Sequence, residues 1–415
     1  MSVKIENSQR LRADIVKYLY YKKTLSLTDL SKLTQRSLPL VTATVNSLIA
    51  DKYLKKKGLA PSTGGRRPLM FLINPAKQKY IVAVAMDQLI TRLVIFNLAN
   101  EIVLQLQLVD LNISEDEQAV GKLITFINSC IQKSGLDRKC LIGIGIGMPG
   151  LVNAEKGINN SYLSTPDGTH LGNHLMEELA LPVFIDNDSS LITLAELHFG
   201  EAEGMQDALV VNVGWGTGLG MIIKGSLYRG SSGYAGEFSH IPLSNTNNLC
   251  ACGKRGCLEV DTSLWVMVEK AKAALAEGTE SRMKMLFKDK SKHYGDHFLD
   301  AVVQQDPLAI SILSDACFQL GKGLSTLIHI LNPKCIVLSG RGARAGKMLL
   351  PAIQQAINEF CIPRIADQTT IVLSNLADNA ELLAAASLVV ENSQFDENSI
   401  RKSTSPIITD LMNAN

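Results

Sequence analysis

Apolar residues return every three to four positions through the first 50 residues, which is the spacing of helices packed on a core. Leu11, Ile15 and Leu19 lie four apart and predict an amphipathic first helix. A second, short helix is expected over 25–33, because Ser26 can serve as its N-cap. A third is expected after Ser37, another candidate cap, with Pro39 in its first turn and an apolar stripe formed by Val41, Val45, Leu48 and Ile49.

Two short strands are expected next, over 53–59 and 68–73, on either side of the turn APSTGGRRP. Three helices with a tight break before the third, followed by a hairpin, predict a winged helix-turn-helix over residues 1–75. In such a fold the third helix meets base edges, and basic residues of the hairpin meet phosphates or a minor groove. The expected DNA contacts are Ser37, Leu38, Pro39, Thr42, Ala43 and Asn46 on the helix, and Lys55, Lys56, Lys57, Arg66 and Arg67 on the hairpin.

The distribution of charge supports a separate N-terminal module. Residues 1–75 hold 14 Lys and Arg against 4 Asp and Glu, whereas the rest of the chain holds 27 against 36. A basic module joined to an acidic body predicts that only the first part binds a polyanion such as double-stranded operator DNA. The alternative is a small helical adaptor domain whose basic face is simply solvated.

From residue 80 onward the pattern changes to strands, glycine turns and helices, which predicts the α/β class. A first series has strands over 81–87, 91–98, 101–109, 140–150 and 181–188 and helices over 115–133 and 189–199. A second series has a strand and hairpin over 208–230, strands over 335–343 and 369–376, and helices over 262–277, 296–304, 307–331 and 346–359. We also expect a helix over 380–390, a surface excursion over 279–294 and a loosely held polar tail over 393–415.

Composition places this chain among cytoplasmic globular proteins. It is 46% apolar and 20% charged, it has no apolar run of 18 or more residues, and its N-terminus is too polar for a signal peptide. We therefore expect no membrane insertion. Reduced cysteines in such a compartment favour metal binding over disulfides.

Four potential zinc ligands lie close together in the stretch 233–259. Nine, one and four residues separate successive members of the set His240, Cys250, Cys252 and Cys257. Zn²⁺ prefers four nitrogen and sulfur ligands in a tetrahedron, and Gly253 and Gly256 allow the tight turn that this spacing needs. The sequence predicts a zinc site, with ordinary buried or exposed thiols as the alternative.

The same stretch resembles a family signature. Its pattern GE-x-x-H, nine residues, C-x-C-G-x-x-G-C-x-E is similar to that of the ROK family, which contains bacterial sugar kinases and sugar-responsive repressors. The resemblance extends over about residues 9–390 and implies a two-lobed, actin-like or hexokinase-like body. It implies a first lobe at 76–190, completed by a helix at about 378–392, and a second lobe at 191–377 with the zinc loop and a dimerisation surface.

In that family the zinc is structural and braces a loop of the sugar pocket. The resemblance implies that the sugar is bound by Gly150, Asn187, Asp188, Glu237, His240 and Glu259. Asp188 also matches the catalytic base of the kinases. From the residues alone, Asp188 could equally cap the helix that follows it.

The loops that would hold ATP phosphates differ from those of the family's kinases. The second loop, with Gly216, Thr217, Gly218 and Gly220, is intact, although a glycine-rich hairpin turn can also be purely structural. The first reads Asp87-Gln88-Leu89-Ile90-Thr91 where the family has D-x-G-G-T. The third has Arg341 between Gly340 and Gly342 where the family usually has Gly. Branched side chains where a backbone must approach phosphate predict that kinase activity is degraded, with Asp188 as a vestigial base.

The leading interpretation is a transcriptional regulator, a repressor of sugar uptake or catabolism genes, whose operator affinity responds to a sugar or sugar phosphate. A homodimer or homotetramer is expected. The alternatives are an ATP-dependent ROK sugar kinase with an appended DNA-binding domain, and a body that binds a sugar-transport protein.

Overall fold

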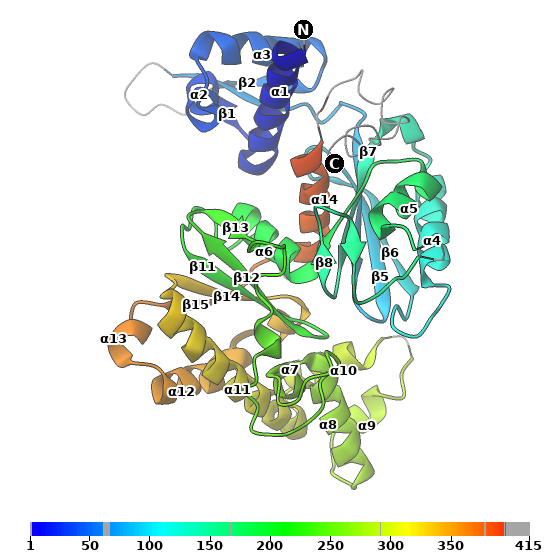
Figure 1. The fold of residues 1–415 in the computed structure, drawn as a ribbon, viewed down its shortest axis with the longest axis vertical. Helices are drawn as coiled ribbons and strands as arrows, with labels where there is room; N and C mark the ends of the chain where they lie inside the picture. The colour runs from blue at the N-terminus through cyan, green and yellow to red at the C-terminus, as the bar shows by residue number, and fades with distance from the viewer. Residues whose placement is uncertain are drawn as a thin grey trace, which may run out of the picture.

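A computed structural model describes residues 2–60, 67–165, 168–290, 292–376, 379–393 and 395, with side chains from residue 8 onward. The expected turn at 61–66, which contains Arg66, and the expected tail from 396 lie outside the described residues. Figure 1 shows an N-terminal unit above a two-lobed body.

The N-terminal unit consists of three helices and a small sheet. Its helices are α1 (Ser2–Lys22), α2 (Leu27–Thr34) and α3 (Leu38–Ala50), and its strands are β1 (Leu25–Ser26), β2 (Leu54–Leu59) and β3 (Leu69–Ile73) in the order β1-β3-β2. The three helices form where the apolar periodicity predicts them. Ser26 caps α2 through a reciprocal bond with Asp29, as expected, whereas the side chain of Ser37 makes no capping bond to α3.

The first lobe is built on a mixed five-stranded sheet in the order β10-β7-β4-β5-β6. Its strands are β4 (Tyr80–Met86), β5 (Ile90–Asn97), β6 (Ile102–Asp110), β7 (Leu141–Met148) and β10 (Val183–Asn187). Helices α4 (Ala119–Ser134) and α5 (Leu171–Leu179) cover one face. The helix α5 was not among the expected elements, although Leu171, Leu175 and Leu179 recur every four residues on its buried face. The strands β8 (Val152–Asn153) and β9 (Ile158–Asn159) have two residues each and are too short to show a period.

The second lobe repeats the same strand order, β13-β12-β11-β14-β15. The strands are β11 (Ala208–Val213), β12 (Thr217–Ile223), β13 (Ser226–Tyr228), β14 (Cys335–Ser339) and β15 (Thr370–Leu373). In both sheets the first three strands are antiparallel and the last two run parallel to the first. The lobes therefore share one topology although their sequences show no obvious repeat.

Helices cover the outer face of the second sheet. They are α8 (Leu264–Ala276), α10 (Tyr294–Val303), α11 (Pro307–Leu331) and α12 (Leu350–Phe360), preceded by the short α7 (Glu259–Thr262) and accompanied by α9 (Met283–Leu286) and α13 (Pro363–Ala366). The expected surface excursion at 279–294 is only partly exposed. Met283 is buried in the core, and Asp306 accepts hydrogen bonds from Ser281 and from the Arg282 amide.

Two helices lie between the sheets. They are α6 (Asp188–Phe199) and α14 (Ala380–Asn392), which pack against each other. The C-terminal helix returns to the first lobe as expected, where Gly145 of β7 admits the Ala385 backbone so closely that a Cβ would lie 1.9 Å from its carbonyl oxygen. One apolar core then runs from α1 and α3 through α14 and α6 to both sheets.

Candidate functional site

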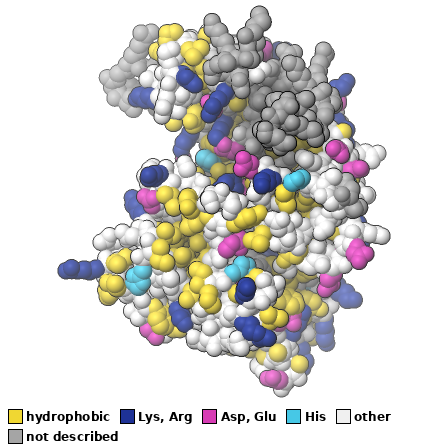
Figure 2. Space-filling view, viewed as in Figure 1, with side chains coloured by type: hydrophobic (Ala, Val, Ile, Leu, Met, Phe, Trp, Pro, Cys, Tyr) yellow, Lys and Arg dark blue, Asp and Glu magenta, His cyan; other side chains and the backbone are white. Residues whose placement is uncertain are grey.

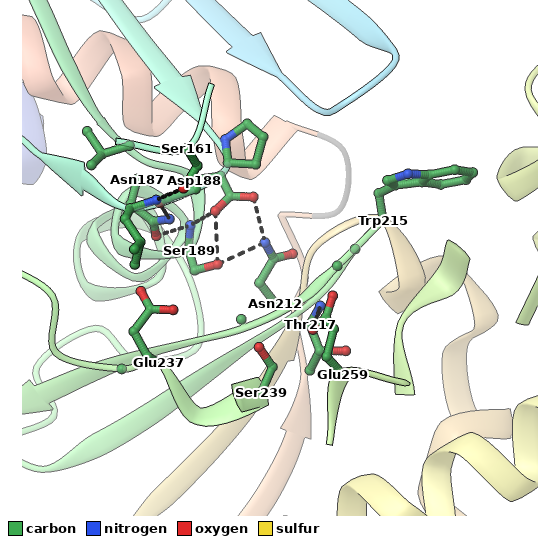
Figure 3. Close-up of a pocket in the computed structure, with 18 of the residues that line it drawn as sticks. Ser161, Asn187, Asp188, Ser189, Asn212, Trp215, Thr217, Glu237, Ser239 and Glu259 are labelled. Carbon is green, nitrogen blue, oxygen red and sulfur yellow. Dashed lines mark hydrogen bonds between the residues drawn. The ribbon is translucent and has the colours of Figure 1, made fainter. Parts of the chain in front are cut away.

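A cavity of about 590 Å³ lies between the lobes. Its wall is contributed by the ends of β4, β7 and β10 from the first lobe and by the β11–β12 turn, the 233–240 loop and the start of α7 from the second. All the side chains and turns expected to contact sugar line it, namely Gly150, Asn187, Asp188, Glu237, His240 and Glu259. Figure 3 shows the carboxyl groups of Asp188, Glu237 and Glu259 around this space.

The helix-capping role falls to Asn187 and not to Asp188. The Asn187 side-chain oxygen accepts hydrogen bonds from the amides of Ser189 and Ser190, at 3.0 and 3.1 Å. The side-chain nitrogen of Asn187, Nδ2, donates a hydrogen bond to the Gly150 carbonyl at 3.1 Å, which ties the cap to the glycine turn. Asp188 is therefore the first helical residue, and its carboxylate lies in the cavity wall.

Asp188 is held from both lobes. One carboxylate oxygen accepts a hydrogen bond from its neighbour Ser189, and the other accepts one from the side chain of Asn212 on β11 at 3.3 Å. Burial raises the pKa of Asp188 to about 7, and the nearby carboxylate of Glu381 acts in the same direction. A group with that pKa can accept or donate a proton near neutral pH.

The other two carboxyl groups are less strongly held. Glu259 accepts one hydrogen bond from the Thr217 amide at 3.1 Å, and burial raises its pKa to about 7. Glu237 lies 3.7 Å from the Nε2 atom of His240, and burial raises its pKa. Free lone pairs on these groups can accept the hydroxyl hydrogens of a polyol.

The four expected zinc ligands come together beside the cavity. Their ligand atoms all lie within 4.8 Å of one another. Cys250 Sγ lies 3.6 Å from His240 Nδ1, and Cys252 Sγ lies 3.6 Å from Cys257 Sγ. A tetrahedral Zn²⁺ with ordinary bond lengths separates its ligands by about 3.5–3.8 Å, so the set fits the ion. Gly253 and Gly256 both have positive φ, as the tight turn requires.

The first phosphate-type loop forms a closed turn. Asp87 Oδ1 accepts hydrogen bonds from the amides of Leu89 and Ile90, both at 2.7 Å. These amides therefore point at Asp87, and neither residue has a positive φ. The loop differs from a phosphate cradle because its donors are already satisfied within the turn.

The third phosphate-type loop is linked to the first. The Arg341 guanidinium lies 3.0 Å from Asp87 Oδ2 across the cleft, with only 11% of its side chain exposed. The Nη1 atom of Arg341 lies 3.9 Å from Asp296 Oδ2. The other carboxylate oxygen of Asp296 pairs with Arg344 at 2.7 Å. An arginine at this position therefore joins the two lobes at the cavity wall.

Close packing accounts for the glycines of the second loop. A Cβ at Gly218 would lie 1.9 Å from Ser189 Oγ, and one at Gly220 would lie 1.8 Å from Thr193 Oγ1, so both let β12 approach α6. A Cβ at Gly216 would lie 2.9 Å from Glu259. The Thr217 amide is already bonded to Glu259. Packing alone therefore explains why glycines stand in this turn, without a bound phosphate.

The expected DNA-contact residues that the structure describes are mostly exposed on the N-terminal unit. Ser37, Leu38, Pro39, Ala43 and Asn46 are exposed, Thr42 is half-buried, and Lys55, Lys56, Lys57 and Arg67 are exposed on β2 and just before β3. Thr42 Oγ1 donates to the Leu38 carbonyl at 2.7 Å. Figure 2 shows several Lys and Arg side chains on the visible side of this unit, among hydrophobic and other side chains. Leu40, 49% exposed beside them, was not among the predicted contacts.

Sequence reasoning missed several residues of the cavity wall. Asn212 holds Asp188, Tyr162 accepts a hydrogen bond from Gln88 at 3.0 Å, and Glu381 of α14 lines the wall and pairs with Arg92. Trp215 lies at its rim (Figure 3). None of them belongs to a short motif, and only the neighbouring glycines of Trp215 could have drawn attention to it.

Comparison with known proteins identifies the body. The ROK family profile matches residues 83–392. The chain belongs to the ROK family. A repressor and a kinase both resemble this chain. The chain is 26% identical over 385 residues to the xylose repressor of Caldicellulosiruptor bescii, covering 91% of this chain and 94% of that protein. It is 31% identical to the glucokinase of Halalkalibacterium halodurans, covering 63% of this chain and 79% of that one.

A solved ROK structure shares the fold over most of the chain. The ROK family transcriptional regulator described as a homologue of the E. coli MLC protein superposes with a TM-score of 0.72 at 24% identity, covering 95% of this chain and 98% of that chain. The actin-like ROK body expected from the sequence is therefore confirmed. Among the described residues, no helix is long and apolar enough to cross a membrane.

Proposed function

We propose that this protein is a sugar-responsive transcriptional repressor, in which the N-terminal unit binds operator DNA and the cavity between the ROK lobes binds the effector. One observation carries the proposal. The alignment with the xylose repressor extends over 91% of this chain, whereas the alignment with the glucokinase extends over only 63%. The chain thus has the repressor layout, with a helical unit ahead of the family body.

We infer that the N-terminal unit supplies the DNA-binding surface. The order of α1, α2 and α3 followed by the β2–β3 hairpin supports a winged helix-turn-helix, in which α3 would enter the major groove. The exposed Asn46 is suited to bidentate contact with adenine, while Lys55, Lys56, Lys57, Arg66 and Arg67 neutralise phosphates. Two copies of the unit in a homodimer or homotetramer would read a palindromic operator in the cytoplasm.

The cavity supplies the effector site. Asn187, Asp188, Glu237, His240 and Glu259, together with the turn at Gly150, offer acceptors and donors for the hydroxyl groups of a sugar or sugar phosphate. Zn²⁺ held by His240, Cys250, Cys252 and Cys257 would supply no chemistry, only a fixed loop. Because His240 belongs to both sites, the metal and the effector share one wall.

A ROK sugar kinase is the second candidate, supported by the glucokinase relative and by the position of Asp188. The closed turn at Asp87 and the Arg341 pair favour the regulator, because they use the groups that would face phosphate.

The experiment is a binding assay with the full chain. Duplexes selected from a random library should bind tightly, and D-xylose, D-glucose or N-acetylglucosamine should change that affinity. A chain that selects no duplex, yet phosphorylates one of these sugars with ATP, would be a kinase and not a repressor.

A further inference from the structure

Two helices extend from the effector cavity to the DNA-binding unit. The first turn of α6 lines the cavity through Asp188, Ser189 and Ser190, and α14 lines it near its start through Glu381. At 1.5 Å per residue these helices reach about 18–20 Å from that wall. Figure 1 shows α14 standing between the lobes, with its far end beneath the N-terminal unit.

The far end of α6 contacts α1 through aromatic rings. His198 stacks on Tyr21, with ring centroids 3.7 Å apart and planes within 10°. Phe199 packs against the rings of Tyr20 and Tyr21, at 6.0 and 5.5 Å. The tyrosine side chains are buried, at 3% and 5% exposure.

The far end of α14 contacts the same helix through a polar cluster. One Glu391 carboxylate oxygen accepts a hydrogen bond from the Tyr21 hydroxyl at 2.8 Å, and the other pairs with the Lys17 ammonium. Tyr21 therefore touches both far ends, with its ring on α6 and its hydroxyl on α14.

The near ends of both helices are tied to the cavity by polar contacts. Asn212 on the second lobe bonds to Asp188, and Arg92 on the first lobe pairs with Glu381. In addition, buried Glu196 of α6 accepts a hydrogen bond from Ser339, the residue before the Gly340-Arg341 turn, at 2.7 Å. A ligand that displaces either lobe's contact with Asp188 or Glu381 thus acts directly on a helix end.

We propose that Tyr21, with His198 and Glu391 as its two contacts, positions the DNA-binding unit according to the state of the effector cavity. Helices packed in a dense core move as rigid elements, so a shift at one end is delivered at the other. The position of α1 sets that of α3, because their buried side chains pack in the same apolar core and Arg12 of α1 pairs with Asp51 at the end of α3. This inference rests on the proposed function and adds the residues that transmit the response.

Transmitting the sugar response differs from merely holding the DNA-binding unit on the body. If these contacts only held the unit in place, their loss would alter operator affinity equally with and without sugar. If these contacts transmit the response, their loss changes the ratio between operator affinity with sugar and operator affinity without sugar. The ratio is therefore the measurement that distinguishes the roles.

The test uses the full chain, a selected duplex, and whichever of D-xylose, D-glucose and N-acetylglucosamine changes its affinity. Tyr21→Phe removes the bond to Glu391 and keeps the ring, and Glu391→Gln removes the charge at constant shape. In each, the sugar-induced change in operator affinity should fall by about threefold or more. Sugar affinity measured by calorimetry without DNA should change less than this ratio does.

A matched control lies on the same helix. Lys22 pairs with Glu203 at 2.7 Å, but both side chains are largely exposed, at 43% and 51%. Lys22→Ala should leave the ratio unchanged. The exchange Lys17→Glu with Glu391→Lys should restore part of the ratio lost in either single variant, provided that the variants remain folded by thermal unfolding.

The outcomes separate the inference from the function it rests on. A wild-type chain whose operator affinity no sugar changes would overturn both. A responsive wild type with Tyr21→Phe and Glu391→Gln equally responsive would overturn the inference alone. Hydrogen exchange offers an independent measure: sugar should alter amide exchange in residues 17–22 of the wild type, and less so in Glu391→Gln.

Discussion

Arg341 and Asp87 form an ion pair, 3.0 Å long, between loops that belong to different lobes. Both side chains are largely buried, with 11% and 19% exposed. Because each charge would be costly to leave unpaired in such a place, the pair ties the two lobes together at the cavity wall. The same pair occupies the loops that resemble phosphate-binding loops, which connects the sequence changes there to a physical consequence.

We therefore expect no ATP-dependent phosphorylation of D-xylose, D-glucose or N-acetylglucosamine by the wild-type chain in a coupled assay. Arg341→Gly should not restore turnover, because the Leu89 and Ile90 amides remain bonded to Asp87. Turnover on the order of 1–10³ s⁻¹, abolished by Asp188→Asn, would contradict this and support the kinase interpretation.

The zinc proposal predicts one tightly bound zinc ion per chain by elemental analysis. Cys257→Ser should lose the ion and lower the free energy of unfolding by several kcal/mol, because a structural metal contributes directly to folding. Cys140→Ser is the matched control, since that thiol lies outside the cluster and should leave the zinc content unchanged. Metal-free protein prepared without chelator and with unchanged stability would refute the assignment.

The DNA proposal predicts two kinds of effect in the N-terminal unit. Arg66→Ala with Arg67→Ala should weaken binding to all duplexes and reduce the salt dependence, whereas Asn46→Ala should cost about 1–3 kcal/mol at the selected site only. Lys133→Ala, at an exposed position of α4 in the body, serves as control and should change neither. Equal DNA binding by the full chain and a 76–415 fragment would show that the surface has been misplaced.

The cavity proposal predicts that effector recognition can be removed without removing DNA binding. Glu237→Ala and Glu259→Gln should weaken sugar binding by about tenfold or more, because hydrogen bonds to charged groups contribute about 1.5–3 kcal/mol. Operator affinity without sugar should stay nearly unchanged. If operator affinity still shifted on adding a sugar that these variants no longer bind, the effector site would lie elsewhere.

The raised pKa of Asp188 has a consequence for stability. Its folded pKa of about 7 exceeds the ordinary 3.8, so the folded protein binds more protons than the unfolded chain between these values. Stability is then highest at low pH for this group and falls as pH rises through 7. Asp188→Asn should flatten the profile of stability against pH. The free energy of unfolding lost between pH 5 and pH 8 should be smaller in the variant than in the wild type by about 2 kcal/mol. Denaturant unfolding at both pH values measures it, and parallel profiles would contradict the assignment.

Local patterns were enough for much of this protein. The stripes of α1 and α3, the apolar central strands of both lobes and the cap of α2 each depend on residues within a few positions of one another. The His240, Cys250, Cys252 and Cys257 set could be recognised for the same reason, since chelation within a short loop is limited by spacing. The relation to known families then indicated the general place of the sugar residues.

Other features depended on contacts between distant parts of the chain. Whether Asn187 or Asp188 caps α6 was decided by the turn at Gly150, and the glycines of β12 were explained only by the approach of α6. Arg341 and Asp87 are separated by most of the body, and Tyr21 near the N-terminus meets His198 from the middle of the sequence and Glu391 from near its C-terminus. Sequence periodicity describes which face of an element is apolar but not which partner covers it, because that choice is made by the packing of the whole chain.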